Sequence, residues 1–195
     1  MKKLSLYMRV SSTEALGPHR RYALWTQGCK KRCPGCISPD AQPMQGGTLV
    51  PISILSSEII NTADIEGITI SGGEPFLQQD ALCELIDQVR QHRDIGVIVY
   101  TGMLYSEVAN TPLLQRCDLL VDGEYIKELN DDKSLRGSAN QNVICITDRY
   151  SKIIDQFYGR AGRKMEFVQK DGSLNMVGIP SKGIADVLCR GDVSK

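Results

Sequence analysis

Short apolar runs recur along the chain and set the expected architecture. Each run is continuous rather than alternating, which is typical of strands buried on both faces, as in a parallel sheet. The runs are Tyr22–Thr26, Gly67–Ser71, Ile95–Tyr100, Leu119–Asp122 and Val143–Ile146. Between several of them, apolar residues repeat at three- and four-residue steps, which indicates helices with one apolar face. The expected helices are Gln79–Gln91, Ser53–Thr62, Leu104–Ala109 and Leu113–Arg116.

The spacing of the expected strands gives the size of the repeating unit. Ile68, Val97, Leu119 and Val143 follow one another at intervals of 29, 22 and 24 residues. Such intervals suit a strand, a crossover helix and the next parallel strand. A full eight-unit barrel needs about 250 residues, so this chain has room for about six units. We therefore expect an α/β fold, either an incomplete (β/α)6-type TIM-like barrel with parallel strands or an open α/β sheet.

The tail departs from this pattern. Lys164–Gln169 and Leu174–Ile179 are strand-like runs on either side of a segment that contains Asp171-Gly172. Asp-Gly between two such runs is a turn signal for a hairpin. We therefore expect a C-terminal β-hairpin.

Composition and charge narrow the class of protein. The 195 residues fit one domain. Lys plus Arg and Asp plus Glu are 23 each, which gives no electrostatic reason to expect a nucleic-acid or membrane-surface protein. No stretch approaches the roughly 18 apolar residues of a transmembrane helix. At the start of the chain, Arg9 and Glu14 interrupt any signal-peptide core. We expect a cytoplasmic protein that binds neither nucleic acid nor membranes.

Cysteine is the residue type that points to chemistry. There are seven cysteines, an odd number without a secretion signal, which favours metal or redox chemistry over disulfides. Cys29, Cys33 and Cys36 have the spacing C-x3-C-x2-C, and soft thiolates select zinc, copper(I) or iron–sulfur. No neighbouring residue supplies a fourth ligand. A three-cysteine [4Fe–4S] cubane would leave one iron open, and the alternative is a structural zinc site with a distant fourth ligand.

The other cysteines stand alone in other segments. Cys is among the most buried residue types, so we expect Cys83, Cys117 and Cys145 in the core and Cys189, near the tail, to be exposed. Trp25, the only tryptophan, is expected in the core beneath the cysteine loop.

A second motif, Gly72-Gly73-Glu74-Pro75, follows a strand-like run. Glycines let the backbone approach a ligand closely, Glu74 adds a negative charge that suits an ammonium group, and Pro75 stiffens the exit toward the next helix. A phosphate site would instead favour Lys or Arg here. By itself the motif is also compatible with a tight strand-to-helix turn.

The candidate residues share one position relative to the strands. The cysteine loop, the Gly-Gly-Glu motif, Thr101 and Asp122 each lie at the end of an apolar run. In a parallel α/β fold the carboxyl ends of the strands meet at one edge, where such folds place their sites.

Together, the two motifs resemble the signature of the radical S-adenosylmethionine (SAM) superfamily. Three segments make the resemblance more specific, namely Cys33-Pro34-Gly35-Cys36, 119–126 and 135–141. They resemble the activating proteins of anaerobic ribonucleotide reductase and other glycyl-radical enzymes, and within these a sub-group of small proteins with a single cluster. The resemblance covers about residues 15–147. It implies one radical SAM domain over 1–195, with this core and a C-terminal extension over about 148–195.

The resemblance also implies a set of site residues. Cys29, Cys33 and Cys36 would be the catalytic residues and would hold a [4Fe–4S] cluster whose open iron binds SAM. The residues that it implies around SAM are Gly35 and Ile37 at the adenine and Gly72, Gly73 and Glu74 at the methionyl amino group. Pro75, Thr101 and Asp122 complete the expected cofactor-binding set, with Asp122 toward the ribose.

The resemblance further implies two kinds of partner. One is a protein that carries the target glycine, and the other is a flavodoxin- or ferredoxin-type electron donor. The chain departs from the activating proteins at Gly17-Pro18-His19, where they often carry Gly-Pro-Gly, and in its longer tail. Both departures bear on which partner the chain acts upon, and neither touches the cluster or SAM.

Two polar segments allow two interpretations each. Arg136, Ser138, Asn140 and Gln141 either bind the partner or SAM or form a polar turn that bonds its own backbone. Lys30, Lys31 and Arg32 either raise the cluster potential and receive an acidic donor or form a solvated charge run.

Three functional hypotheses remain. The first is a radical SAM enzyme that installs a glycyl radical on a partner, because an incomplete barrel has an open side that a large partner can seal. The second keeps the SAM chemistry but acts on another peptide or a small molecule. The third is a non-catalytic zinc-binding module, which has no use for the Gly-Gly-Glu motif.

Overall fold

The computed structural model describes residues 2–158, 163–170 and 172–184. The strands of the main sheet are β1 (Lys3–Thr13), β2 (Arg21–Thr26), β3 (Thr48–Pro51), β4 (Gly67–Gly72), β5 (Gly96–Tyr100), β6 (Leu119–Asp122) and β7 (Asn142–Cys145). They lie in the order β3-β1-β2-β4-β5-β6-β7. The hairpin strands β8 (Met165–Lys170) and β9 (Ser173–Gly178) form a separate two-stranded antiparallel sheet, as expected for the tail.

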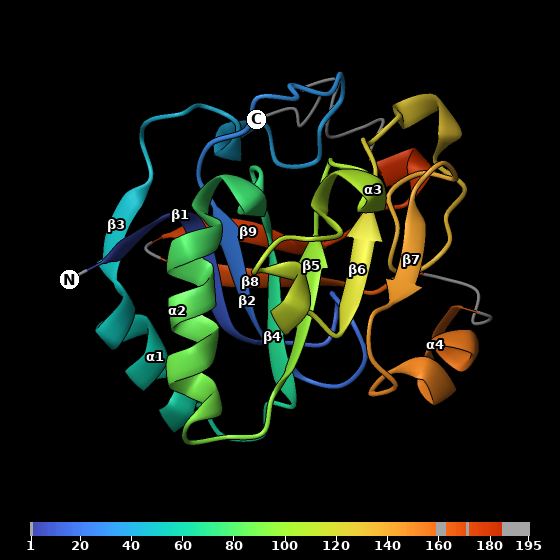
Figure 1. Cartoon of the computed structure of the whole chain (residues 1–195). Helices are drawn as coiled ribbons and strands as arrows, with labels where there is room; N and C mark the ends of the chain where they lie inside the picture. The colour runs from blue at the N-terminus through green and yellow to red at the C-terminus, as the bar shows by residue number, and fades with distance from the viewer. Residues whose placement is uncertain (1, 159–162, 171, 185–195) are drawn as a thin grey trace.

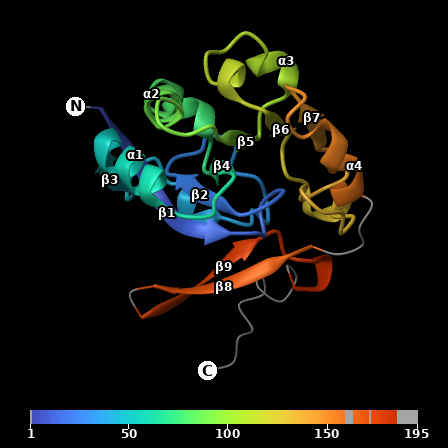
Figure 2. The same ribbon diagram turned by 90° about the horizontal axis from the view of Figure 1, so that it is seen from below.

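The helices lie mainly on one side of the sheet. They are α1 (Ile52–Asn61), α2 (Gln79–Arg90), α3 (Tyr105–Val108) and α4 (Ser151–Tyr158). Helices α1, α2 and α3 cover one face of the main sheet (Figure 1). The β8–β9 hairpin lies against the opposite face (Figure 2).

The central strands confirm the expected α/β pattern. Strands β2, β4, β5 and β6 are parallel neighbours, and α1, α2 and α3 fall in the connections between them. In α2, the apolar residues Leu82, Leu85, Ile86 and Val89 are all buried against the core. The carboxyl ends of β2, β4, β5 and β6 therefore meet at one edge of the sheet, as predicted.

The outer strands differ from the prediction of parallel strands. Strand β7 is antiparallel to β6, so the expectation of a parallel strand at Val143–Ile146 was wrong. The connection from β6 to β7 contains a 3-10 turn but no crossover α-helix, and without a crossover the chain turns straight back. Strands β1 and β3, which pair antiparallel, and helix α4 were not predicted. In β1 the buried residues Leu4, Leu6 and Val10 are separated by exposed or half-buried ones, so no continuous apolar run marks it.

Of the three apolar clusters among the described residues, two hold helices α1–α3 and the hairpin against the sheet. The larger lies between the sheet and the helices. The smaller joins the hairpin to β1 and β2, and its buried members are Val10, Leu16, Ala23, Trp25, Val177 and Ile179. This second cluster fixes the hairpin to the face of the sheet that the helices leave uncovered (Figure 2).

A fully buried arginine ties together the amino ends of the central strands. The Arg21 guanidinium donates to the Thr69 hydroxyl at 2.7 Å, to a Glu66 carboxylate oxygen at 2.5 Å and to the Tyr150 hydroxyl at 2.8 Å. It also donates to the carbonyls of Ile68 and of the first residue of β5. Because a buried charge is tolerated only when it is paired and hydrogen-bonded, this network fixes β2, β4, β5 and the start of α4 in one arrangement.

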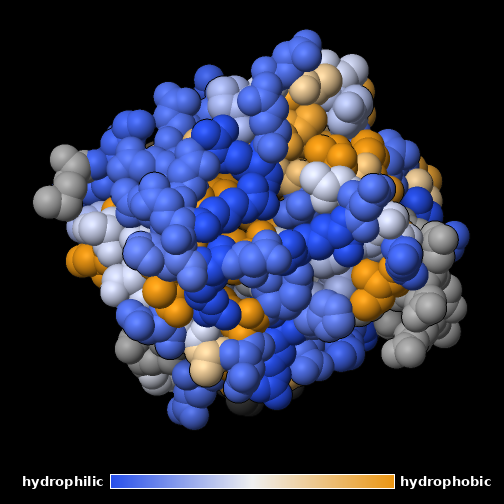
Figure 3. All heavy atoms as spheres, turned by 60° about the horizontal axis from the view of Figure 1, so that its bottom comes forward, coloured by the Kyte–Doolittle hydropathy of each residue, from blue (hydrophilic) through white to orange (hydrophobic). Residues whose placement is uncertain are grey.

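The outer surface toward the amino ends of the strands is mainly hydrophilic, and its apolar residues form small separate groups (Figure 3). Across the described residues, no helix has the length and apolar character that a membrane crossing requires.

Replacing Arg21 with Met tests the buried network. We expect the free energy of unfolding in urea to fall by at least about 3 kcal/mol, because breaking a buried ion pair leaves polar partners without compensation. The matched control is Arg149→Met, which also removes a positively charged partner of Glu66. Unlike Arg21, the Arg149 side chain is 27% exposed. That control should cost less than about 1 kcal/mol, and equal losses in the two variants would contradict the assigned role of Arg21.

Candidate functional site

The cysteine loop (residues 28–42) leaves the sheet directly after β2 and is closed by hydrogen bonds at its base. The amide of Gly28 donates to the carbonyl of Ala41 at 2.8 Å, and the amide of Cys29 donates to that of Gln42 at 2.9 Å. The side-chain amide of Gln27 donates to two further carbonyls, at positions 40 and 43. The ends of the loop are therefore held by the backbone, and the cysteines occupy the span between them.

A glutamine after the Gly-Gly-Glu motif links the loop to the edge of the sheet. The Gln78 side chain accepts from the amide of Ser5 at 2.8 Å and donates to the carbonyls of Ser5 at 2.9 Å and Gln27 at 3.0 Å. Sequence reasoning missed Gln27 and Gln78. Their partners lie far along the chain, and no local pattern marks either residue.

The Gly-Gly-Glu motif packs backbone to backbone against the base of the cysteine loop. The Gly73 amide donates to the carbonyl of Thr26, and the Glu74 amide donates to that of Gly28, both at 2.8 Å. A Cβ on Gly73 would lie 2.2 Å from the Gly28 carbonyl oxygen. Gly72 has a φ of +109°, and a Cβ there would lie 2.4 Å from the Thr26 amide nitrogen. Both positions therefore require glycine. At Gly73 any side chain would clash with backbone, and at Gly72 a side chain would clash and the backbone conformation is also one that favours glycine.

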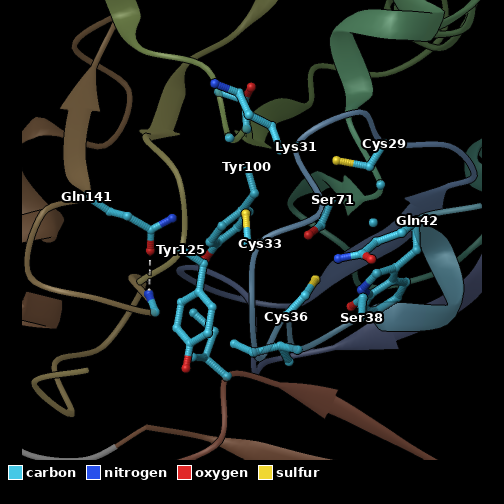
Figure 4. Close-up of a pocket in the computed structure, with 18 of the residues that line it drawn as sticks. Cys29, Lys31, Cys33, Cys36, Ser38, Gln42, Ser71, Tyr100, Tyr125 and Gln141 are labelled. Atoms are coloured by element: carbon cyan, nitrogen blue, oxygen red, sulfur yellow. Dashed lines mark hydrogen bonds between the residues drawn. The ribbon is translucent and has the colours of Figure 1, made fainter. Parts of the chain in front are cut away.

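The three cysteines of the loop border one cavity at the carboxyl ends of the strands. Their sulfur atoms point into the same space (Figure 4). The predicted site residues that line this cavity are Cys29, Cys33, Cys36, Ile37, Gly72, Gly73 and Thr101. Ser71, Tyr100, Tyr125 and Gln42 line it as well, and sequence reasoning did not single them out, since motif patterns do not mark them.

The donor set fits an iron–sulfur cluster. None of the three cysteines forms a disulfide with another described residue, and thiolates are the ligands that hold such clusters. Within the described residues, no three His, Cys, Asp or Glu side chains stand close enough to hold a single metal ion. A cubane is larger than one ion and suits thiols placed around a cavity. Burial and the neighbouring Glu124 carboxylate raise the pKa of the Cys33 thiol to about 11.

Glu74 is buried and already bound by the protein. Its carboxylate accepts from the Thr101 hydroxyl at 2.8 Å, the Gly102 amide at 3.0 Å and the Phe76 amide at 3.1 Å. Burial raises its pKa, although these hydrogen bonds and the charge of Lys31 act in the opposite direction. The side chain thus joins the ends of β4 and β5, and Glu74 and Pro75 are not among the residues that line the cavity.

The two other strand-end residues are placed differently. The Thr101 hydroxyl faces Glu74, and Thr101 lines the cavity. Asp122 is buried, accepts from the Tyr105 amide at 2.7 Å and the Asn142 side chain at 2.8 Å, and does not line the cavity. Its neighbour Gly123 does line it.

A groove of about 850 Å³ continues from the cavity. This volume lies within the ~300–1,000 Å³ that small-molecule sites occupy. Cys33, Cys36 and Ile37 border both spaces, and Gly35 borders the groove. The far wall of the groove comes from β9, through Leu174, Asn175, Met176 and Gly178.

The 136–141 segment forms a polar turn that bonds to nearby backbone groups, and a role in binding the partner or SAM stays a prediction. The Gln141 side chain accepts from the Gly137 amide at 2.8 Å (Figure 4) and donates to the carbonyl of Gly123 at 2.8 Å. Ser138 accepts from the amide of Ile126, Asn140 donates to the carbonyl of Glu124, and Arg136 pairs with Asp131. Gln141 and Gly137 also line the cavity.

The structure also shows how far Trp25, the isolated cysteines and the basic run at 30–32 are buried. Trp25 is buried and borders both spaces beneath the cysteine loop. Cys83 and Cys117 are buried, as expected, whereas Cys145 on β7 is only half-buried. Cys189 lies outside the described residues. Lys30, Lys31 and Arg32 are exposed, and Lys31 lines the cavity.

The fold and the cysteine site define an iron–sulfur protein class. Residues 15–144, more than half of the chain, match the family model of the 4Fe-4S single cluster domain. The chain belongs to this family. The matched segment includes the cysteine loop and the Gly-Gly-Glu motif but ends before the β8–β9 hairpin.

The relatives of the chain among known proteins include several that are named as activating proteins or activating enzymes. The anaerobic ribonucleoside-triphosphate reductase-activating protein of Enterobacteria phage T4 is 27% identical over 137 residues, which cover 68% of this chain and 88% of the relative. The protein of the same name from Escherichia coli K12 is 32% identical, over 65% of this chain and 89% of the relative. The pyruvate formate-lyase-activating enzyme of Staphylococcus epidermidis is 30% identical, over 66% of this chain and 55% of the relative.

Gly73→Ala tests the close approach of the two loops. We expect it to lower the free energy of unfolding by about 1–3 kcal/mol, the cost of overpacking, and to reduce the iron bound after reconstitution. Gly102→Ala is the matched control, because its Cβ would come closest to the flexible Lys31 side chain, at 3.3 Å, and would meet a Glu74 carboxylate oxygen only at an ordinary contact distance of 3.7 Å. It should change stability by less than about 0.5 kcal/mol, and a Gly73 variant as stable and as iron-rich as this control would refute the steric argument.

Glu74→Gln tests the buried carboxylate through pH. Because the pKa of Glu74 is raised in the folded chain, the folded state binds this proton more tightly than the unfolded state. The stability that it contributes is complete below the unfolded pKa of about 4.3 and is lost as pH rises through the raised pKa. The free energy of unfolding of the wild type, minus that of the variant, should therefore fall as pH rises over this window. A difference that stays constant with pH would rule out this assignment.

Proposed function

We propose that this protein is a radical SAM enzyme that installs a glycyl radical on a partner protein. The observation that carries the proposal is one cavity lined by the three cysteines and by Gly72 and Gly73, in a chain of the 4Fe-4S single cluster family. The relatives named as activating proteins of a ribonucleotide reductase and of pyruvate formate-lyase support the choice of reaction.

In this proposal Cys29, Cys33 and Cys36 hold a [4Fe–4S] cluster. When bound, the cluster supplies the electron that cleaves SAM into methionine and a 5′-deoxyadenosyl radical, which takes a hydrogen atom from the target glycine. The protein contributes binding, orientation and exclusion of competing reactions.

The other cavity residues position SAM in this proposal. The backbone of Gly72 and Gly73 receives the methionyl amino group, and the Glu74 and Pro75 turn behind them keeps this backbone in place. Gly35 and Ile37 border the adenine in this proposal. Ile37 lines both the cavity and the groove, and Gly35 lines the groove. Thr101 and Asp122 act near the ribose, Thr101 from the cavity wall and Asp122 through the adjoining Gly123.

Trp25 and Tyr100 give the cavity apolar walls, which favours exclusion of water from a reactive radical. We further propose that the main sheet is an incomplete (β/α)6-type barrel and that the chain forms one radical SAM domain, with its core at about 15–147 and the hairpin in its extension.

The electron donor in this proposal is a flavodoxin- or ferredoxin-type protein, and the setting is the cytoplasm. The support is the exposed run Lys30-Lys31-Arg32 inside the cysteine loop. Positive charge beside the cluster ligands would attract an acidic donor to the point where the electron enters.

Anaerobic reconstitution tests the function directly. We expect about four irons and four sulfides per chain, and after dithionite reduction the chain should convert SAM to 5′-deoxyadenosine. Cys29→Ala, Cys33→Ala and Cys36→Ala should each abolish this product and the cluster absorbance, because each removes one of the three ligands. Cys83→Ala, a buried cysteine on α2 away from the cavity, is the matched control and should retain both. One zinc per chain without sulfide or SAM cleavage would refute the proposal.

A further inference from the structure

The β8–β9 hairpin lies outside the region that matches the 4Fe-4S family model, yet it builds part of the site. Of its two strands, only β9 contributes to the groove that opens from the cysteine cavity. In Figure 1, β9 is the hairpin strand nearer the cysteine loop. The hairpin thus adds a wall to the site that the rest of the fold does not supply.

The hairpin is held rigidly in this position. The Val177 side chain is fully buried in the cluster that it shares with Trp25. The Arg163 side chain, 3% exposed, donates to the carbonyls of Pro180 at 2.5 Å and Arg136 at 2.7 Å. The Glu166 carboxylate also accepts from the amide of Glu14 at 2.9 Å. These contacts fix both strands to the first and last parts of the core.

The edge of β9 that faces away from β8 bears no strand among the described residues, since that sheet consists of β8 and β9 alone. Lys170 pairs with Ser173 as the innermost strand pair, with two residues between them in the sequence, and the pair that closes such a hairpin exchanges hydrogen bonds. Hydrogen-bonded and non-bonded pairs then alternate along an antiparallel ladder. The backbone groups of Leu174 and Met176 therefore point away from β8, toward the open edge.

The side chains along this edge match an extended chain. Leu174 is 69% exposed, and Met176 and the apolar residues Tyr7 and Met8 of β1 line the same groove. The groove also runs on into the cavity, because both include Cys33, Cys36 and Ile37. A strand added to β9 would gain backbone hydrogen bonds, apolar contacts for alternate side chains and a path to the cysteines.

We propose that β9 is the docking edge for the substrate, and that this substrate is an extended segment of a protein, which adds to the hairpin as a third strand. The inference rests on the proposed function and makes it more specific, because it commits to a polypeptide rather than a small molecule. The strand would lie in the groove so that one of its residues reaches the cavity.

Two proline variants test the edge. Met176→Pro removes an amide that points to the open edge of β9. Phe167→Pro is the matched control, because Phe167 pairs with Met176 in the register, so its amide points to the opposite edge, that of β8. The probe is a displayed library of short unstructured peptides with a fixed central glycine, selected anaerobically on the chain loaded with cluster and SAM.

We expect selected peptides to bind the wild type and to lose at least about tenfold in affinity with Met176→Pro, from the lost hydrogen bond and the clash of the ring. Affinity for Phe167→Pro should change by less than about twofold, since proline is tolerated at a free sheet edge. Hydrogen exchange on the wild type gives a second readout. The amides of Leu174 and Met176 should become protected when peptide is bound, whatever the stability of the variants.

Equal affinities in the two variants, no protection at β9, or no enriched peptide would each overturn the docking edge. The same preparation is assayed for 5′-deoxyadenosine without peptide. SAM cleavage by a wild type that binds no peptide at β9 overturns the docking edge alone. Peptide binding at β9 without SAM cleavage overturns the proposed function and leaves the edge in place.

Discussion

The parallel pairing of β2 and β4 continues past the ends of both strands, and the site depends on this continuation. After the last strand pair, Gly73 still bonds to Thr26 and Glu74 to Gly28. The cysteine loop is thereby attached to the sheet through backbone atoms, at a distance that only a residue without a Cβ permits. Since these bonds use no side chain of the loop, the residues between the cysteines are not needed to hold its base in place.

Buried charges stabilise the two ends of the same central strands. At the amino ends, Arg21 of β2 donates hydrogen bonds to backbone carbonyls of β4 and β5 and to the Glu66 carboxylate just before β4. At the carboxyl ends, Glu74 gathers amide and hydroxyl donors from the start of the next connections. Both groups have several partners, as a charge removed from water requires. The site therefore rests on strands whose register is fixed at both ends, and this rigidity favours precise positioning of a cofactor.

The central part of the fold was predictable because its signals are local. Continuous apolar runs and the periodicity of α2 report burial directly, and Asp171-Gly172 indicates the hairpin turn. Strand β1 was missed because its polar positions face solvent and break the run. The motifs also predicted part of the cavity lining, but not Tyr100 or Tyr125. They did not predict that the Glu74 carboxylate would turn toward Thr101, nor that Gln78 would reach Ser5. Those contacts join segments far apart in sequence, and no single-sequence pattern encodes them.

The position of the hairpin in the chain gives the site an order of assembly. The cysteine loop belongs to the first quarter of the chain, whereas β9, which walls the groove, belongs to the last. During synthesis from the amino terminus, the sheet and its cysteines emerge while the face that the hairpin will cover is still open. Docking of Val177 and Ile179 beside Trp25 then covers this face. The order of the sequence thus places the cysteine loop before the strand that completes its surroundings.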